Sequence, residues 1–571
     1  MSRDKIPVAT VSLLHHLFRS KRLSPKELIT HCHRIASQNQ LNAFSHVCDL
    51  TKLLQQAQLS QERYEQNAPL SKLDGMPVSI KANIAASDFP LTASSNMLSC
   101  PGYDSKVVER LKRAGCIIIG QTNMDEFGMG SLGTLSNRGI VRNPYECDGA
   151  CVSNHILLNE NNDDDAIHQL IHIIRDSTHQ ENRNDIMENT LFKATGGSSS
   201  GSAVSVAIGA SILSIGTDTG GSIRLPSAWC GVVGLKPTYG SISRYGLVSY
   251  ASSLDTVGIM GRTVQCASLG WDVLMSAPDA NDSNIHFEKS MSDSTSYYHE
   301  KRNTSMTHQS YTKHETKSSK SLEGTTIGIP EAFSVQGIAP DILRQWEKTC
   351  IILEKHGATV KHISSTLISP QIVKMCLPAY YVLTCAEASS NLARYDGLRY
   401  GNDVLEKIIN ENGFEESRQE RFSNTRRLFG KEVQRRILAG TAVLSSDRFH
   451  SHYEAALKCR AKITLQINQA FKHECDAILI PTSVGHPPVL MSGESLSTLD
   501  EGYAVDGTEA FKNDIMAVPI SLAGLPSLSV PIKVNLESSS KSHGVVGMQL
   551  VGPTMGEDCL FRIARVLERN V

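Results

Sequence analysis

The stretch that decides the fold reads Thr-Gly-Gly-Ser-Ser-Ser-Gly-Ser over residues 195–202. An Ala/Val/Ile-rich segment follows it, and then Gly-Thr-Asp-Thr-Gly-Gly-Ser-Ile-Arg over residues 216–224. Two glycine–serine turns therefore flank one helix of small residues. Glycine lets the backbone approach a ligand and adopt positive φ, and successive N–H groups in such a turn can converge on a developing anion. Since a serine hydroxyl is unreactive without a base, serine chemistry at these turns requires a base from elsewhere in the chain.

Two other interpretations of these turns compete with the one adopted below. A phosphate-binding P-loop needs a lysine before its last Ser or Thr, and neither turn has one. Residues 197–201 match the Gly-x-Ser-x-Gly elbow of α/β-hydrolases, which would make Ser199 the nucleophile. An elbow directly follows an apolar strand, whereas residues 188–195 read Glu-Asn-Thr-Leu-Phe-Lys-Ala-Thr. An esterase that uses Ser199 stays an alternative hypothesis.

The spacing of apolar residues along the chain predicts an α/β protein with an N-terminal helical extension. Short apolar runs alternate with helical stretches from residue 75 onward, which is the α/β pattern. Before that, apolar residues recur at helical spacing over residues 11–35, and Ser24 followed by Pro25 is a helix-start signal. We therefore expect the extension over residues 1–70 and the main domain over residues 71–571.

Two stretches have the composition of surface insertions rather than of a core. Residues 146–189 are rich in Asn, Asp and His, with one short amphipathic helix expected near residues 166–175. Residues 279–321 are dominated by Ser, Thr, His and Lys. We predict that both are polar insertions that extend from turns at the surface of the main domain.

The bulk composition excludes several classes of function. There are 56 Lys and Arg against 58 Asp and Glu, so a net charge of −2 offers no steering toward nucleic-acid phosphates. The 14 cysteines are scattered, and we expect reduced thiols. Cys147, Cys151 and His155 match no standard zinc spacing, so we expect no metal site. Because no window reaches the roughly 18 apolar residues of a membrane span, we expect no membrane segment.

Four blocks in order resemble the amidase-signature family. They are Gly-Met-Pro-Val-Ser-Ile-Lys-Ala-Asn at residues 75–83, the two glycine–serine turns, and Gly-Val-Val-Gly-Leu-Lys-Pro-Thr at residues 231–238. The resemblance extends from about residue 23 to residue 567, apart from the insertions. Ala82 stands where the family usually has Asp, and Ser200 where it has Gly. The resemblance implies the amidase-signature fold, a large mixed β-sheet between layers of helices.

The resemblance also implies a catalytic set of lysine, bridging serine and nucleophilic serine at Lys81, Ser198 and Ser222. Burial disfavours the charged form of a lysine and can turn it into a base. Ser198 would then relay a proton between Ser222 and Lys81, so no histidine is needed. The implied oxyanion hole consists of backbone N–H groups of the second turn, chiefly those of Thr219, Gly220 and Gly221.

Within the family, blocks at residues 121–131, 239–255, 386–397 and 431–446 resemble the A-type subunits of glutamyl-tRNA(Gln) amidotransferases. This resemblance implies a glutaminase that releases ammonia from glutamine for the conversion of Glu-tRNA(Gln) to Gln-tRNA(Gln), with no cofactor of its own. ATP and Mg²⁺ would be used by a B-type partner subunit, which would also bind most of the tRNA, and a small C-type subunit would complete a heterotrimer. The implied location is the mitochondrial matrix, with the cytoplasm as the alternative. A stand-alone amidase acting on another amide and an inactive scaffold subunit stay alternative hypotheses.

The same resemblance implies substrate-recognition residues at Tyr380, Arg436 and Asp514, with Tyr250 near the pocket. An arginine fork suits the α-carboxylate of glutamine, and a carboxylate suits its α-ammonium group. The alternative for Arg436 is an exposed ion pair, since most arginines lie at the surface.

Overall fold

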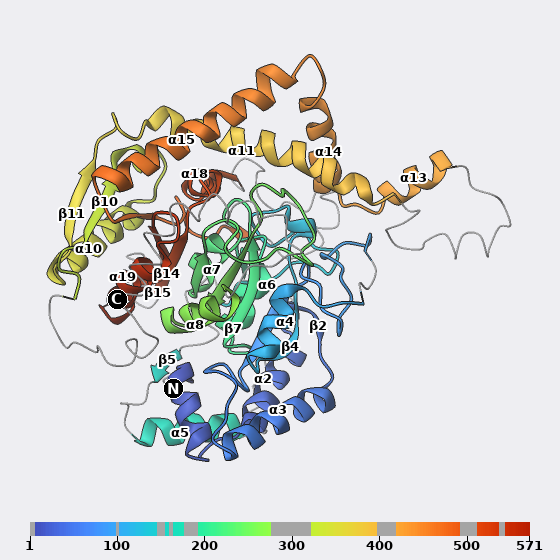
Figure 1. Ribbon diagram of the computed structural model, residues 1–571, viewed down its shortest axis with the longest axis vertical. Helices are drawn as coiled ribbons and strands as arrows, with labels where there is room; N and C mark the ends of the chain where they lie inside the picture. The colour runs from blue at the N-terminus through green and yellow to red at the C-terminus, as the bar shows by residue number, and fades with distance from the viewer. Residues whose placement is uncertain are drawn as a thin grey trace.

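The computed structural model describes residues 6–98, 102–145, 155–158, 164–175, 192–275, 321–396, 418–490, 511–535 and 543–570. Residues 279–320 of one predicted insertion and most of the other, at residues 146–189, lie outside the described residues. Figure 1 shows a central sheet, with the N-terminal helices at one end and the long helices of the C-terminal third at the other. No helix among the described residues is long and apolar enough to cross a membrane.

An eleven-stranded mixed sheet forms the centre of the molecule, in the order β11-β10-β12-β15-β14-β8-β9-β7-β3-β4-β2. Its strands are β2 (Phe44–Val47), β3 (Pro77–Lys81), β4 (Ile117–Thr122), β7 (Leu213–Asp218), β8 (Val233–Lys236), β9 (Thr256–Gly261), β10 (Thr326–Pro330), β11 (Thr359–Ile363), β12 (Ala477–Pro481), β14 (Ser527–Asn535) and β15 (His543–Val551). Strand β3 pairs in parallel with β4 and β7, whereas β9 pairs antiparallel with β7 and β8. Central strands such as β3, β4 and β7 are buried along their whole length, as expected for a sheet covered on both faces.

The described part of the chain also contains helices, some of which cover the faces of this sheet while others lie beyond its ends (Figure 1). They are α1 (Val11–Arg19), α2 (Pro25–Gln38), α3 (Leu50–Glu65), α4 (Lys106–Arg113), α5 (Asp164–Arg175), α6 (Ser200–Ala207), α7 (Arg224–Cys230), α8 (Val264–Leu274), α10 (Pro340–Lys355), α11 (Pro370–Asn391), α13 (Arg418–Arg426), α14 (Lys431–Val443), α15 (Glu454–His473), α18 (Val518–Leu522) and α19 (Glu557–Asn570). Short helical turns are η1 (Glu126–Gly128), η4 (Glu331–Phe333), η5 (Leu392–Arg394), η6 (Phe449–Tyr453) and η7 (Asn513–Met516). Two further strand pairs lie outside the main sheet: β1 (Ile6–Ala9) with β5 (His155–Leu158), and β6 (Phe192–Lys193) with β13 (Val489–Leu490).

Neighbouring residues of β7 show how the two helical layers are held. The Ser214 hydroxyl accepts a hydrogen bond from Ser79 of β3, and Ser79 also bonds Ser205 of α6. The preceding residue, Leu213, points to the other face and lies against Gly270 of α8. The predicted architecture of a mixed sheet between helical layers is therefore confirmed.

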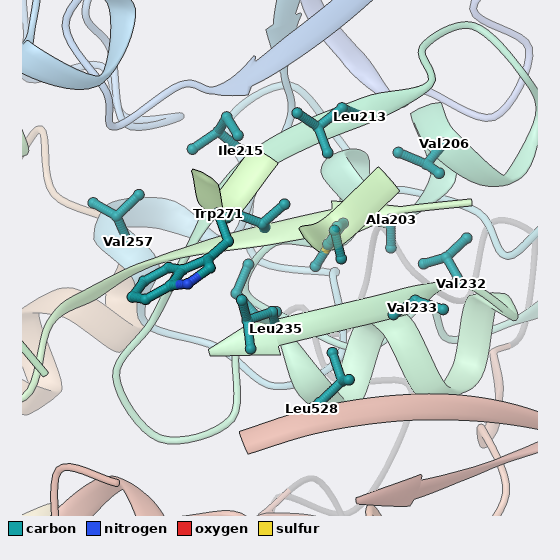
Figure 2. Close-up of a cluster of buried hydrophobic side chains, with 14 of the residues drawn as sticks. Ala203, Val206, Leu213, Ile215, Val232, Val233, Leu235, Val257, Trp271 and Leu528 are labelled. Atoms are coloured by element: carbon teal, nitrogen blue, oxygen red, sulfur yellow. The ribbon is translucent and has the colours of Figure 1, made fainter. Parts of the chain in front are cut away.

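The apolar core fixes the strands that carry the two glycine–serine turns. Figure 2 shows Trp271 of α8 among labelled side chains of β7, β8 and β9, including Ile215, Leu235 and Val257. All four side chains are buried. Burial of each large apolar side chain contributes about 1.5–3 kcal/mol to the stability of the fold. The core therefore holds the ends of these strands in place.

The N-terminal region contains the expected helices and two unexpected strands, β1 and β2. Helix α2 begins with a capping box, in which the Ser24 hydroxyl accepts from the Glu27 N–H and the Glu27 carboxylate accepts from the Ser24 N–H. The predicted helix start at Ser24 and Pro25 is confirmed. Strand β2, however, pairs antiparallel with β4 at the edge of the main sheet. Residues 1–70 thus contribute to the sheet as well as to the helices, and a domain boundary near residue 70 stays a prediction.

The described part of the first insertion packs on the N-terminal region. Helix α5 confirms the predicted amphipathic helix, because it buries the apolar side chains Ile167, Leu170, Ile171 and Ile174. Its Arg175 donates to the Glu27 carboxylate of α2 at 2.7 Å, and β5 extends in parallel with β1. At the base of the insertion, the Asn143 N–H donates to the Lys193 carbonyl at 3.3 Å, so the chain leaves and returns at one place.

Candidate active site

The first glycine–serine turn and the end of β3 meet because β3 and β7 are parallel neighbours. Ile80 of β3 lies opposite Ile215 of β7, so the carboxyl ends of both strands reach the same edge. Lys81 is the last residue of β3, and Ser198 directly precedes the first turn of α6, which packs on β3 and β7. Residues separated by more than 100 positions in the sequence are thereby brought into hydrogen-bond contact.

Lys81 is fully buried and makes three hydrogen bonds to hydroxyl groups. Its Nζ lies 2.8 Å from Ser198 Oγ, 2.7 Å from Ser199 Oγ and 2.9 Å from Thr217 Oγ1. Burial lowers the pKa of Lys81 to about 7, against the opposing effect of buried carboxylates nearby. A large fraction of this lysine is therefore a neutral amine near neutral pH, which is the state a general base requires.

The hydrogen bonds around Lys81 decide which hydroxyl faces the lone pair of the neutral amine. Ser199 Oγ donates to the Thr217 carbonyl at 3.0 Å, so its oxygen is left to accept from Lys81. Thr217 Oγ1 accepts from the Asn83 amide at 3.2 Å as well as from Lys81. A neutral amine has two N–H donors and one lone pair, and these two acceptors occupy the donors. In the neutral amine the lone pair is left for the third contact, the Ser198 hydroxyl at 2.8 Å, which is compatible with the proton transfer that the family resemblance implies.

Ser199, the nucleophile of the esterase hypothesis, lies behind Lys81. Its side chain is fully buried, and its hydroxyl is occupied by Lys81 and by the Thr217 carbonyl. Ser222, in contrast, lines the pocket described below. The geometry favours Ser222 as nucleophile and gives Ser199 the role of orienting the lysine.

We expect Ser199→Ala to lower kcat by about 10- to 100-fold without changing the nucleophile. Removing one partner of a buried hydrogen bond costs about 1–3 kcal/mol, and here the loss falls on the orientation of the base. Ser200→Ala is the matched control, because among the described residues the buried Ser200 hydroxyl has no hydrogen-bond partner. Kinetics and labelling with a serine-reactive fluorophosphonate give the readout. A Ser199→Ala chain that loses all labelling would contradict this role.

The second turn is tied at both ends by a buried ion pair. Arg224 donates to the two Asp218 carboxylate oxygens at 3.0 and 2.9 Å, and neither side chain is exposed. Burial alone would raise the pKa of Asp218, but the Arg224 guanidinium holds it below its usual value. Arg224 also donates to the Ala517 carbonyl and to Gln549. These bonds anchor the turn to β15 and to the start of α18 without using the Ser222 hydroxyl.

The backbone N–H groups of this turn are free to bind an anion. Within the described part of the chain, the N–H groups of Thr219, Gly220, Gly221 and Ser222 donate to no acceptor. Gly221 has φ 145°, a region that favours glycine, and a Cβ on Gly220 would lie 2.5 Å from the Tyr380 ring. Both glycines are therefore required by the local geometry. N–H groups that are free in this way could stabilise an oxyanion, and their role as an oxyanion hole stays a prediction.

Ser222 lines the pocket, and a backbone hydrogen bond joins its turn to the first glycine–serine turn. The Ser199 N–H donates to the Ser222 carbonyl at 3.2 Å, which holds the two turns together. The Gly197–Ser198 peptide bond is cis. Among the described residues the Ser222 hydroxyl makes no hydrogen bond, so it is available to a substrate. Of the implied relay, the link between Ser198 and Lys81 is a direct contact, whereas the link between Ser222 and Ser198 stays a prediction.

Ser222 lines a pocket whose space, open solvent included, is about 260 Å³. It is lined by Gly128, Gly130, Ser131, Gly197, Gly220, Gly221, Ser222, Tyr380, Tyr381, Arg436 and Asp514. Tyr380, Arg436 and Asp514, the residues expected at the substrate, thus all line this volume. Ser131 and Tyr381 were not among the expected residues, although both lie in or beside the stretches that carry the resemblance.

Arg436 is a buried cation on one wall of the pocket. Only 5% of its surface is exposed, so the alternative of an exposed ion pair is wrong. Its Nε donates to Glu432 at 2.8 Å and its Nη1 donates to the Tyr250 hydroxyl at 2.5 Å, which places Tyr250 behind the guanidinium. The Tyr381 ring lies 5.3 Å from the guanidinium carbon, a favourable cation–π distance. The Nη2 group has no partner among the described residues and can reach a substrate anion.

Asp514 provides a carboxylate on the same pocket. Its Oδ2 accepts from the Ser131 hydroxyl at 2.8 Å and from the Tyr381 hydroxyl at 3.1 Å. Burial raises the pKa of Asp514 to about 6. Because both hydroxyls use Oδ2, Oδ1 remains for a ligand, and it lies about 4.0 Å from where a Cβ on Gly221 would be. The pocket therefore has a cationic and an anionic group near one nucleophile.

The described residues contain no group of three or more His, Cys, Asp or Glu that could hold a metal ion. Cys147 and Cys151 lie outside the described residues, so the expectation of no metal there stays a prediction. The described cysteines are free thiols.

Curated relatives and solved structures match the chain over nearly its full length. The mitochondrial A-type subunit of the glutamyl-tRNA(Gln) amidotransferase of Anopheles gambiae is 33% identical, covering 98% of this chain and 97% of that protein. The corresponding protein of Alkaliphilus metalliredigens is 34% identical, with coverage of 99% and 97%. A crystal structure of the corresponding protein from Thermotoga maritima has a TM-score of 0.61 at 27% identity, covering 97% of this chain and 95% of that chain.

A native peptide amidase from Stenotrophomonas maltophilia has a TM-score of 0.64 at 22% identity, with coverage of 100% and 97%, and shares the fold. The amidase family model matches residues 28–151 and 188–561. The gap between the two matched segments falls within the first insertion, and the matched segments hold the strands and turns that carry Lys81, Ser198 and Ser222. From its motifs, its fold and its relatives together, the chain belongs to the amidase family.

Proposed function

We propose that this chain is the glutaminase subunit of a glutamyl-tRNA(Gln) amidotransferase. It hydrolyses glutamine and supplies the ammonia with which Glu-tRNA(Gln) is converted to Gln-tRNA(Gln). The names and coverage of the relatives support this proposal. The observation that carries it is the pairing of Arg436 and Asp514 beside Ser222, because a free amino acid has one anionic and one cationic end.

In the proposed complex, Arg436 Nη2 binds the α-carboxylate and Asp514 Oδ1 binds the α-ammonium group. The side-chain carbonyl oxygen of glutamine accepts from the N–H groups of the second turn. Ser222 Oγ attacks the carbonyl carbon, its proton passes to Ser198 Oγ, and the Ser198 proton passes to Lys81 Nζ. The tetrahedral oxyanion is stabilised by the backbone donors, each of which can contribute about 10²–10³ in rate.

The second half of the reaction uses the same relay in the opposite direction. Protonated Lys81 returns a proton through Ser198 to the amide nitrogen, the carbon–nitrogen bond breaks and ammonia leaves. The γ-glutamyl ester on Ser222 is then attacked by water, which gives its proton to Ser198 and Lys81. Cleavage of the ester bond releases glutamate and restores the Ser222 hydroxyl.

The remaining steps of the proposed pathway belong to other subunits. Each of these relatives is named as one subunit of an amidotransferase, which supports an assembly with further subunits. We expect a B-type subunit to use ATP and Mg²⁺ and to bind most of the tRNA, and a small C-type subunit to complete a heterotrimer. The net charge of −2 agrees with tRNA being held mainly by the partner. We further propose a place in the mitochondrial matrix, on the ground that the Anopheles relative is mitochondrial.

We expect Arg436→Ala to lower kcat/KM for glutamine by about 10- to 100-fold, the loss of a charge-assisted hydrogen bond of about 1.5–3 kcal/mol. The same variant should be nearly unaffected with 4-aminobutanamide, which lacks the α-carboxylate. Asp514→Ala should show the reverse selectivity, a loss with glutamine and little change with glutaric acid monoamide, which lacks the α-amino group.

Steady-state ammonia release from the three amides checks both variants against wild type. Equal losses on all three substrates would mean that these residues support the fold or the catalytic set. Neither residue would then support glutamine as the substrate. Mass spectrometry of the protein mixed with glutamine tests the function directly, since a γ-glutamyl adduct is expected on the peptide that contains Ser222. An adduct on another serine, or none in an enzyme that hydrolyses other amides, would favour the stand-alone amidase hypothesis.

A further inference from the structure

A buried glutamate joins the glycine-rich wall of the pocket to the helix that carries Arg436. Glu126 lies in η1, immediately before Gly128 and Gly130 of the pocket lining. Its Oε1 accepts from the Ser95 hydroxyl at 2.5 Å, and its Oε2 accepts from the Gly430 N–H at 2.8 Å. Gly430 is 304 residues away in the sequence and is the N-cap residue of α14.

The carboxyl group of Glu126 binds the start of helix α14. The first N–H groups of a helix have no partner within the helix, and glycine has no side chain with which to cap them. The N–H of Gly430 is one of these donors, and Glu126 accepts from it from outside the helix. A Cβ on Gly430 would collide with Glu126 Oε2, so this close approach needs glycine.

The capped turn leads directly to Arg436. Glu432, in the first turn of α14, accepts from Arg436 Nε at 2.8 Å and is itself buried. An unbroken series of contacts thus connects Glu126 to Gly430, then along one helical turn to Glu432, and then to the guanidinium. Ring packing strengthens the same junction, because Phe127 lies 5.5 Å from Phe429.

We propose that Glu126 is a positioning residue for substrate specificity: by fixing the first turn of α14, it holds Arg436 where it can reach the carboxylate of the substrate. The inference rests on the proposed function, in which that carboxylate is the α-carboxylate of glutamine. Glu126 does not line the pocket and acts through Gly430, Glu432 and Arg436.

Kinetics of the purified full-length chain on glutamine and on 4-aminobutanamide test the proposal. Glu126→Ala should raise KM for glutamine about tenfold, with kcat changed less than twofold, and should leave the kinetics with 4-aminobutanamide unchanged. Glu126→Gln should recover most of the affinity, because its amide oxygen can still accept from Gly430. Ser95→Ala is the matched control: it removes the other partner of the same carboxylate and should leave KM for glutamine near the wild-type value.

Gly430→Ala provides a second route to the same junction if Glu126→Ala does not fold, and it should give the same rise in KM for glutamine alone. A change of equal size with both amides, or a fall in kcat with KM unchanged, would overturn the proposal. If wild type prefers glutamine and neither variant alters that preference, only the role of Glu126 fails. If wild type shows no preference for glutamine over 4-aminobutanamide, the proposed function fails and this inference falls with it.

Discussion

Ser222→Ala should abolish glutamine hydrolysis, with kcat falling by roughly 10⁴-fold or more, as expected when a nucleophile is removed. Ser222 lines the pocket in the turn whose N–H groups are free among the described residues. The fold should persist, because the turn is anchored by Asp218 and Arg224 rather than by the lost hydroxyl. Ammonia release and the melting temperature of the variant give the two measurements.

Ser199→Ala, treated above, is the comparison that makes this result decisive. Both substitutions remove one hydroxyl from neighbouring turns, but Ser199 is occupied by Lys81 and the Thr217 carbonyl. If Ser222→Ala still hydrolysed glutamine and Ser199→Ala were inactive, the esterase hypothesis would be supported and the proposed mechanism would be wrong.

Lys81→Arg should fail almost as completely as Lys81→Ala, with kcat reduced by about 10²–10⁴-fold, the usual contribution of a general base. A guanidinium keeps its proton at any pH that the protein tolerates, so it cannot accept one from Ser198. Conservation of the charge therefore gives no rescue. Near-native turnover in the Lys81→Arg chain would take Lys81 out of the proton relay.

The pH profile of the wild-type enzyme is the companion measurement for Lys81. Burial lowers its pKa to about 7, and only the neutral amine can act as the base. The expected kcat is therefore low in acid, rises as pH increases through about 7 and levels off above. Measuring kcat at saturating glutamine separates this titration from that of Asp514, which affects substrate binding. A flat kcat between pH 5 and 9 would contradict a titrating lysine, since a group with a pKa near 7 changes state within that window.

Local patterns were sufficient for several elements of this protein. The Ser24–Pro25 signal predicted the start of α2, and the amphipathic spacing near residue 170 predicted α5, because caps and 3.6-residue periodicity express local backbone physics. Strand β2 was missed, since Phe44–Val47 is a four-residue edge strand whose pairing with β4 no local pattern encodes. The resemblance to a family, rather than periodicity, supplied the mixed sheet.

The sequence by itself determined the chemical inventory: Lys81 after an apolar strand, two glycine–serine turns, and Arg436 and Asp514 as charged candidates for recognition. The tertiary structure alone decided their states and partners. It buried Lys81 and so lowered its pKa, turned Ser199 toward the lysine rather than the pocket, added Ser131 and Tyr381 around Asp514, and brought Glu126 to the cap of α14. The physical reason is that a pKa depends on desolvation and on nearby charges, and a hydrogen bond on a separation of about 3 Å. Between groups 304 residues apart, as Glu126 and Gly430 are, such a separation exists only when the chain has folded.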